Sequence, residues 1–313
     1  MRRLAVLAFV LFAGEARAQN AEISLRACEG GDASACASLG SLYETGSAGL
    51  QLDYARAYRL YERGCRGGAA FGCASVGRYL ERGVTVPMNV ARAATMYESA
   101  CNGGYSYACG DLGRLYVDAS GVTRDVPRGV ALLVKACDAG HAASCATLGR
   151  VHRTSALDLA KSAHFEDKAC QLGVMFSCAM LAEAYHRASG VPRDEAQAQR
   201  LSERACAGGE NLGCSNIALP RLAQLREGWC SHDNWNACMQ VGGQYEGGNG
   251  VPREASRAAT FYELACTHGN AIGCYSLADL YRKGTGVHQS DESAASYDRM
   301  ACTLGLQQAC RSK

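Results

Sequence analysis

Eighteen cysteines constrain this chain more than any other feature, because they fall into nine pairs of one kind. In each pair the two cysteines stand eight positions apart, and none is left over. The first cysteines of successive pairs are separated by 37, 36, 36, 33, 36, 24, 36 and 36 residues. A period near 36 residues is typical of solenoids built from two-helix repeats. The pairs are Cys28–Cys36, Cys65–Cys73, Cys101–Cys109, Cys137–Cys145, Cys170–Cys178, Cys206–Cys214, Cys230–Cys238, Cys266–Cys274 and Cys302–Cys310.

The residues around each pair predict the first helix of a repeat. Eight pairs have glycine three positions after the first cysteine, where a chain leaving a helix needs a left-handed residue, and only Asp233 departs from this rule. After the second cysteine come an aliphatic residue at the third position, Gly or Ala at the fourth and often Tyr at the seventh, as at Leu112, Gly113 and Tyr116. These offsets mark one face of a helix.

A second amphipathic segment precedes each first cysteine and predicts the second helix of the repeat, as in residues 90–100. Links such as Gly121-Val122 join the first helix to the second. Each cysteine pair therefore ties the end of one second helix to the start of the next first helix. We expect a disulfide at every pair, which closes a short loop and stabilises the fold by about 2.5 kcal/mol in the chain-entropy model.

The first 18 residues read as a secretory signal peptide. A basic start is followed by an apolar stretch over residues 4–13 and an Ala-x-Ala cleavage site at residues 16–18. We therefore expect the mature chain in the periplasm or outside the cell, where disulfides persist. Seven residues between cysteines do not match zinc-site spacing, so we predict no metal and no cofactor. His152 stands at a repeated tyrosine position and is predicted to be a packed helix residue.

Charge argues against nucleic acid and anionic membranes as partners. Removing residues 1–18 takes 32 basic and 30 acidic side chains to 29 of each, a net charge of zero. No later stretch approaches the roughly 18 apolar residues that a membrane-spanning helix needs. We therefore predict neither nucleic-acid binding nor membrane insertion.

The repeated pattern resembles a known family. The motif Ala-Cys-x-x-Gly-x-x-x-x-Cys-x-x-Leu-Gly-x-x-Tyr, followed by Gly-Val and a Tyr-rich second helix, is similar to the Sel-like repeats, relatives of the tetratricopeptide repeats. Within them it looks most like the cysteine-rich branch typified by the Helicobacter cysteine-rich proteins, over residues 22–310. The resemblance implies an all-α, right-handed α/α solenoid with a disulfide in each repeat. We predict one solenoid of about eight repeats over residues 19–313, irregular at 206–238.

The repeat near Pro220 is shortened to 24 residues, and the proline should kink or end its first helix. The only two tryptophans, Trp229 and Trp235, stand close to it. In one interpretation they fill the volume of the lost helix. In the other they line an aromatic notch, with His232 and Asp233 nearby, that could hold a ligand.

The first helices are expected to present the binding surface along the concave side. Five positions after the second cysteine, three consecutive repeats carry Arg78, Arg114 and Arg150, a ladder able to take carboxylates. Asp111 and Asn216, two positions after their cysteines, could add polar contacts to an extended peptide. The alternative is that these side chains form only a solvated face.

No catalytic motif supports an enzyme. The sequence lacks S-x-x-K, S-D-N, K-T-G, G-x-S-x-G, H-E-x-x-H and phosphate-binding loops. We predict an exported scaffold, related to the cell envelope, that binds protein or peptide, with cell-wall peptide as one candidate. The resemblance implies the competing function, β-lactamase or penicillin-binding activity. A third hypothesis is a rigid spacer without a ligand.

Overall fold

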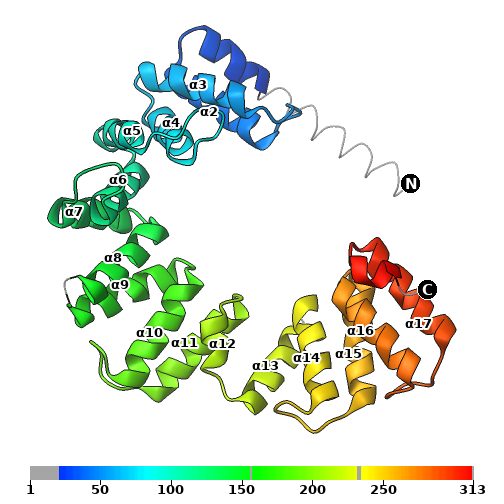
Figure 1. The fold of residues 1–313 in the computed structure, drawn as a ribbon. Coiled ribbons are helices and arrows are strands. Elements are labelled where there is room, and N and C mark those ends of the chain that lie inside the picture. The colour runs from blue at the N-terminus through cyan, green and yellow to red at the C-terminus, as the bar shows by residue number, and fades with distance from the viewer. Residues whose placement is uncertain (1–20, 156, 231–233, 312–313) are drawn as a thin grey trace, which may run out of the picture. The chain divides into compact units, whose positions relative to one another are not determined.

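The computed structural model describes residues 21–155, 157–230 and 234–311, and all regular secondary structure within them is helical (Figure 1). The predicted all-α architecture of two-helix repeats is confirmed. The first helices of the repeats are α2 (Ala33–Thr45), α4 (Ala70–Arg82), α6 (Ser106–Asp118), α8 (Ala142–Thr154), α10 (Met175–Arg187), α12 (Asn211–Ser215), α14 (Trp235–Gly247) and α16 (Ala271–Lys283). The second helices are α3 (Tyr54–Arg66), α5 (Val90–Asn102), α7 (Val126–Asp138), α9 (Leu159–Gln171), α11 (Glu195–Ala207), α13 (Leu219–Cys230), α15 (Ala255–Thr267) and α17 (Asp291–Thr303), and a short 3-10 helix, η1, covers Gln307–Arg311.

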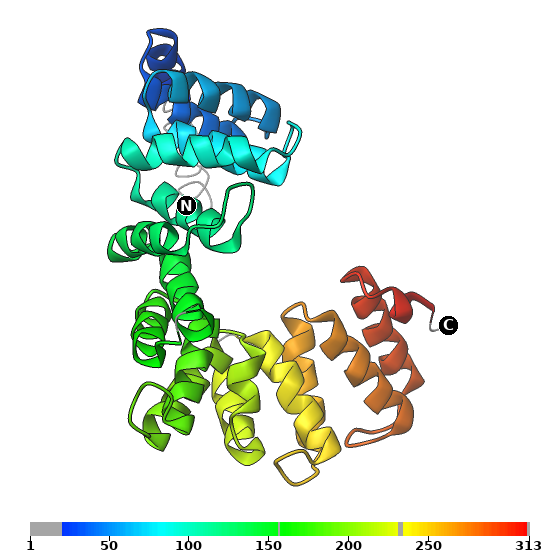
Figure 2. The ribbon, with the colours of Figure 1, turned by 60° about the vertical axis from the view of Figure 1, so that its left-hand side comes forward.

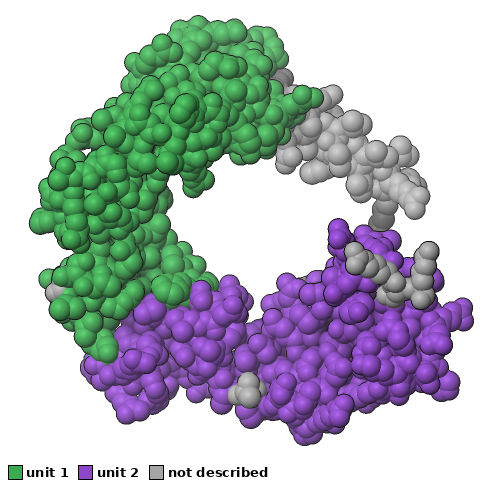
Figure 3. Space-filling model, viewed as in Figure 1, with its two compact units in different colours: residues 1–177, 189–191 green, residues 178–188, 192–313 purple. Residues whose placement is uncertain are grey.

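The chain divides into two compact units (Figure 3). Unit 1 comprises residues 1–177 and 189–191, and unit 2 comprises residues 178–188 and 192–313. In unit 1, neighbouring helices from α2 to α9 pack on one another in chain order, as Figures 1 and 2 show. In unit 2 the same holds for α13 to α17, and α11 packs on α12. Within the described residues, no helix is both long and apolar enough to cross a membrane.

Disulfides join the end of each second helix to the start of the next first helix, as predicted for this fold. Eight of the Cys-x7-Cys pairs have Cα atoms 4.4 to 4.9 Å apart. Cys170 and Cys178 are also disulfide-bonded. The turn inside the loop uses the predicted glycine. At Gly104, for example, φ is 90°, which a residue with a Cβ rarely adopts.

A second rule governs how the two helices of a repeat meet. The small residue four positions after the second cysteine faces the side chain four positions before the next first cysteine. A Cβ on Gly77 would lie 2.8 Å from the ring of Tyr97, and one on Gly242 would lie 2.5 Å from the ring of Tyr262. Glycine is therefore needed at these positions because the partner ring occupies the space.

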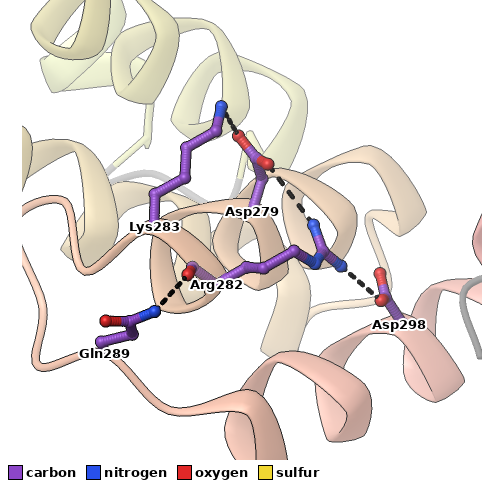
Figure 4. Close-up of polar contacts among 5 residues, drawn as sticks. All are labelled: Asp279, Arg282, Lys283, Gln289 and Asp298. Atoms are coloured by element: carbon purple, nitrogen blue, oxygen red, sulfur yellow. Dashed lines mark hydrogen bonds and ion pairs between the residues drawn. The ribbon is translucent and has the colours of Figure 1, made fainter.

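The residue eight positions after the second cysteine completes this contact. Three tyrosines donate their hydroxyl to a glutamate at that position: Tyr61 to Glu44 at 2.6 Å, Tyr97 to Glu81 at 2.8 Å and Tyr262 to Glu246 at 2.7 Å. In two other repeats the first helix carries the donor and the second helix the carboxylate: Arg153 donates to Glu166 at 2.8 Å and Arg282 to Asp298 at 2.7 Å. Figure 4 shows the second pair, in which Arg282 also contacts Asp279. A large or charged side chain from the second helix thus fills each of these spaces.

The shortened repeat loses most of its first helix. Helix α12 ends at Ser215 after 5 residues, and α13 begins at Leu219. Pro220 therefore lies in the first turn of α13, where its missing N–H costs little. The helix predicted to be kinked or ended at this proline instead ends before it.

Candidate functional site

The three predicted arginines lie on consecutive first helices of unit 1, α4, α6 and α8. Each reaches the preceding first helix and binds a carboxylate there. The pairs are Arg78–Glu44, Arg114–Glu81 and Arg150–Asp118. Each guanidinium of this ladder is thus already bound to a carboxylate of the chain itself, and a ligand carboxylate would have to share or displace that partner.

Glu44 shows how strongly these pairs are held. Arg78 donates from two nitrogens, at 2.6 and 2.8 Å, and Tyr61 donates to the same carboxylate. Burial alone would raise the pKa of Glu44, but the hydrogen bonds from Arg78 and Tyr61 lower it overall. The carboxylate therefore stays ionised, and bidentate pairing of this kind fixes the guanidinium in place.

Asp111 differs from these paired acids. It lies on α6, and its carboxylate makes no hydrogen bond with any residue that the structure describes. Burial raises the pKa of Asp111 to about 6, although the nearby Arg114 opposes the change. A half-buried acid that lacks a hydrogen-bond partner has a carboxylate available to a ligand.

Beside Asp111 runs a line of aromatic rings that the sequence interpretation missed. We define the aromatic strip as Phe71, Tyr105, Tyr107 and His141, from α4 and the starts of α6 and α8. Their ring centroids are 5.8 Å apart for Phe71 and Tyr105, 5.7 Å for Tyr105 and Tyr107, and 4.9 Å for Tyr107 and His141. Phe71 is 37% and Tyr107 43% exposed.

The strip and Asp111 belong to one surface. Tyr107 and Asp111 are four residues apart on α6 and therefore lie on one face of that helix. Burial and the charge of Asp111 also raise the pKa of Tyr105. His141 accepts or donates a hydrogen bond with Ser144 at 2.8 Å, and burial lowers the pKa of this histidine, so its ring is neutral at pH 7. The sequence signal was an aromatic residue two positions before the second cysteine in adjacent repeats, at Phe71 and Tyr107.

The candidates of the shortened repeat lie in unit 2. Trp229 packs in a hydrophobic cluster with Ile217 and Leu222, which fits the packing interpretation. Trp235 belongs to a different cluster, and its ring stacks on His268 with centroids 3.5 Å apart. Among the described cavities, Trp229 and Trp235 line different ones. His232 and Asp233, the other residues of the predicted notch, are outside the described residues.

Asn216, the last predicted residue, lines a cavity of about 560 Å³ between α10, α11 and the link from α12 to α13.

His152, predicted to be a packed helix residue, is buried. Its ring stacks on Phe165 with centroids 5.5 Å apart, and burial lowers the pKa of His152. Across the parts of the chain that the structure describes, no group of three or more His, Cys, Asp or Glu side chains is arranged to hold a metal.

The fold and the stapled repeats define the class: a disulfide-bonded α/α repeat scaffold, whose stacked helices present extended surfaces. The Sel1 repeat model matches residues 33–68, 70–105, 106–141, 176–210, 235–270 and 271–306, more than half of the chain. The chain belongs to the Sel1 repeat family.

Solved structures agree with this assignment. The protective antigen c5321 of uropathogenic Escherichia coli has an SLR fold and is 25% identical to this chain, with a TM-score of 0.63. The match covers 92% of this chain but only 65% of the antigen. A Sel1 repeat protein from Oxalobacter formigenes is 22% identical with a TM-score of 0.53, over 93% of this chain and 89% of its own. Helicobacter pylori cysteine rich protein B is 24% identical, over 51% of this chain and 97% of its own, with a TM-score of 0.25. A comparison with curated proteins found no match.

Proposed function

We propose that the chain is a scaffold that binds an extended peptide segment of a partner protein along the first helices α4, α6 and α8 of unit 1. The observation that carries this proposal is the aromatic strip, which crosses three successive repeats beside the unpartnered carboxylate of Asp111. Aromatic side chains offer large contact area at low entropic cost and are enriched in interface cores.

The geometry of an extended peptide suits this surface. A polyproline II segment rises about 3.1 Å per residue and repeats every three residues, so equivalent side chains recur every ~9 Å. The rings of the strip follow one another from α4 to α8 with centroids 4.9 to 5.8 Å apart. An extended peptide that lies along the strip therefore has a stacking surface for the side chains that face it. Asp111 accepts a hydrogen bond from a peptide N–H or from a basic side chain of the ligand.

Export is the second part of the proposal. Residues 1–18 carry the pattern of a cleaved signal peptide, and disulfides throughout the repeats are typical of an oxidising compartment. Residence in the periplasm or release from the cell follows, with the partner then a protein or peptide of the cell envelope. N-terminal sequencing of the exported chain tests this, because an intact N-terminus at Met1 contradicts it.

The binding test starts from a displayed library of random 12-residue peptides, selected on the oxidised protein. The double variant Phe71→Ala/Tyr107→Ala should weaken the selected peptides by about tenfold or more, since buried aromatic anchors often contribute over 1 kcal/mol each. Phe176→Ala is the matched control: this residue occupies the same repeat position and is 48% exposed, but it has no ring neighbour among the described residues. Equal losses in both variants, or none in the double variant, would refute the proposed surface.

The enzyme alternative stays a prediction from the resemblance. Turnover of a chromogenic lactam, lost on a single substitution, would establish it. Binding of peptide without lactam turnover is the outcome that the scaffold predicts.

A further inference from the structure

One repeat breaks the rule by which the two helices of a repeat fill the space between them. In the repeat formed by α10 and α11, the small residue four positions after the second cysteine is Ala182. The side chain that should fill the space opposite, four positions before the next first cysteine, is Ser202. In three other repeats this place holds Tyr61, Tyr97 or Tyr262, whose rings are buried, and in three more it holds Leu133, Glu166 or Asp298. Here both partners are small, and both line a cavity.

Among the residues whose side chains the structure describes, a cavity remains at this contact. His186, eight positions after the second cysteine, bonds to Glu195 with its Nδ1 at 2.9 Å from the carboxylate oxygen. The next first helix, α12, ends at Ser215, so it provides no second turn to cover the opening. The result is the cavity of about 560 Å³, which lies wholly within unit 2.

The lining of the cavity resembles that of a side-chain pocket. Its inner part is formed by Ala182, Ala198, Ser202 and Ile217, which are buried or nearly so. Charged side chains gather at its margin, and each has a partner: Arg187 pairs with Glu183, Arg221 with Glu203, and Glu195 with Arg193 and with the ring of His186. The inner wall is thus small and largely apolar, whereas most of the remaining lining residues are polar or charged. Such a lining suits a side chain that has both an apolar body and a polar end.

The chain itself shows what fits such a space. In three other repeats it holds a phenol ring, against a glycine on one side and with its hydroxyl on a glutamate at the end of the first helix. In the α10–α11 repeat the ring is missing, but a carboxylate remains at the margin, Glu195, which is held by His186 and Arg193. We infer that this cavity binds the side chain of a tyrosine presented by a partner protein, in the place that the chain's own tyrosines fill elsewhere.

The volume supports a peptide-borne tyrosine over a free phenol alone, because about 560 Å³ exceeds one side chain and leaves room for flanking backbone. Asn216 lies on the cavity wall, where its amide can donate to and accept from that backbone. This inference does not rest on the proposed peptide surface, which lies on helices of unit 1.

The probe is N-acetyl-L-tyrosinamide, titrated to about 10 mM while the methyl signals of Ala182, Ala198 and Ile217 are followed by NMR. We expect saturable shifts of these signals. N-acetyl-L-phenylalaninamide, which lacks the hydroxyl, should bind about fivefold more weakly, in line with the loss of one hydrogen bond. N-acetyl-L-alaninamide should leave the signals unchanged.

The double variant Ala182→Gly/Ser202→Tyr restores the pattern of the other repeats and fills the cavity with the chain's own ring. It should fold, as circular dichroism and thermal unfolding will show, and should no longer respond to the probe. Should it not fold, Ala182→Leu blocks the same space from the other helix. Phe176→Ala, outside the cavity, should respond like the parent protein. No shift in the parent, an equal response to the alanine probe, or an unchanged response in a folded, filled variant would overturn the inference.

Discussion

Replacing Asp111 by asparagine should stabilise the protein at neutral pH. An aspartate in the unfolded chain titrates near 3.8, whereas burial raises the pKa of Asp111 to about 6 in the folded chain. The folded state therefore holds the proton more tightly, and ionisation of Asp111 opposes folding. The penalty is absent below the unfolded value of 3.8, grows as the pH rises towards 6 and is complete above it. Asparagine has nearly the same shape but carries no charge.

The magnitude follows from the two pKa values. The difference between 3.8 and about 6 corresponds to about 3 kcal/mol at 1.36 kcal/mol per pKa unit. Because the carboxyl keeps some contact with water, we expect a gain of about 1–2 kcal/mol at pH 7.5. At pH 3.5 the gain should fall to about a few tenths of a kcal/mol, because aspartate is then protonated in the folded state and mostly protonated in the unfolded state.

The assay is urea unfolding of the oxidised protein at several pH values between 3.5 and 8. Asp138→Asn is the control, because that carboxylate is 57% exposed and contacts Lys168 at 3.0 Å. Its change should stay within about 1 kcal/mol, as for exposed ion pairs. An asparagine variant at position 111 that is less stable at pH 7.5, or a gain that does not depend on pH, would refute this reasoning.

Two further predictions concern the fold. Gly242→Ala should destabilise by about 1–3 kcal/mol, since its Cβ would lie 2.5 Å from the ring of Tyr262. The adjacent Gly243→Ala should instead stabilise by about 0.5–1 kcal/mol, because its Cβ meets only the tyrosine hydroxyl, at 3.6 Å, and alanine favours a helix. Chemical unfolding measures the change in stability for both variants, and a change of the same sign in the two would contradict the packing rule. Replacing Cys101 and Cys109 together by serine should cost about 2.5 kcal/mol, and an unchanged unfolding free energy without reductant would contradict the role of this staple.

The fold could be predicted because the strongest signals are local and repeated. A cysteine pair with a glycine three positions into its loop sets the turn between helices without help from distant residues, and Gly104 has the positive φ that this position predicts. The offsets of three, four and seven residues then place the apolar face of each first helix. Leu112 and Gly113, identified from these offsets, are both buried.

The candidate site could be predicted only in part, because its properties depend on pairs far apart in sequence. The ladder of Arg78, Arg114 and Arg150 was found, but the carboxylates that bind it lie 32 to 34 residues earlier, on the preceding first helix. Asp111 was identified by position, whereas its raised pKa depends on burial that only packing reveals.

The cavity of unit 2 shows the same limit. Neither Ala182 nor Ser202 is unusual alone, and their effect appears only when the first and second helices are known to meet at these two positions. Comparing that pair with Gly77 and Tyr97 in another repeat would have found it. The two tryptophans are rare residues and point to the shortened repeat, but neither of them lines this cavity.

The central claim is that a peptide binds along α4, α6 and α8, and photo-crosslinking tests it most directly. Tyr107→p-benzoylphenylalanine places the reactive group on the aromatic strip, and Tyr54→p-benzoylphenylalanine places it on a second helix, α3, at a residue that is 42% exposed. Peptides selected on the native protein should crosslink from position 107 and not from position 54. Equal yields from both positions, or a yield from position 54 alone, would contradict the account.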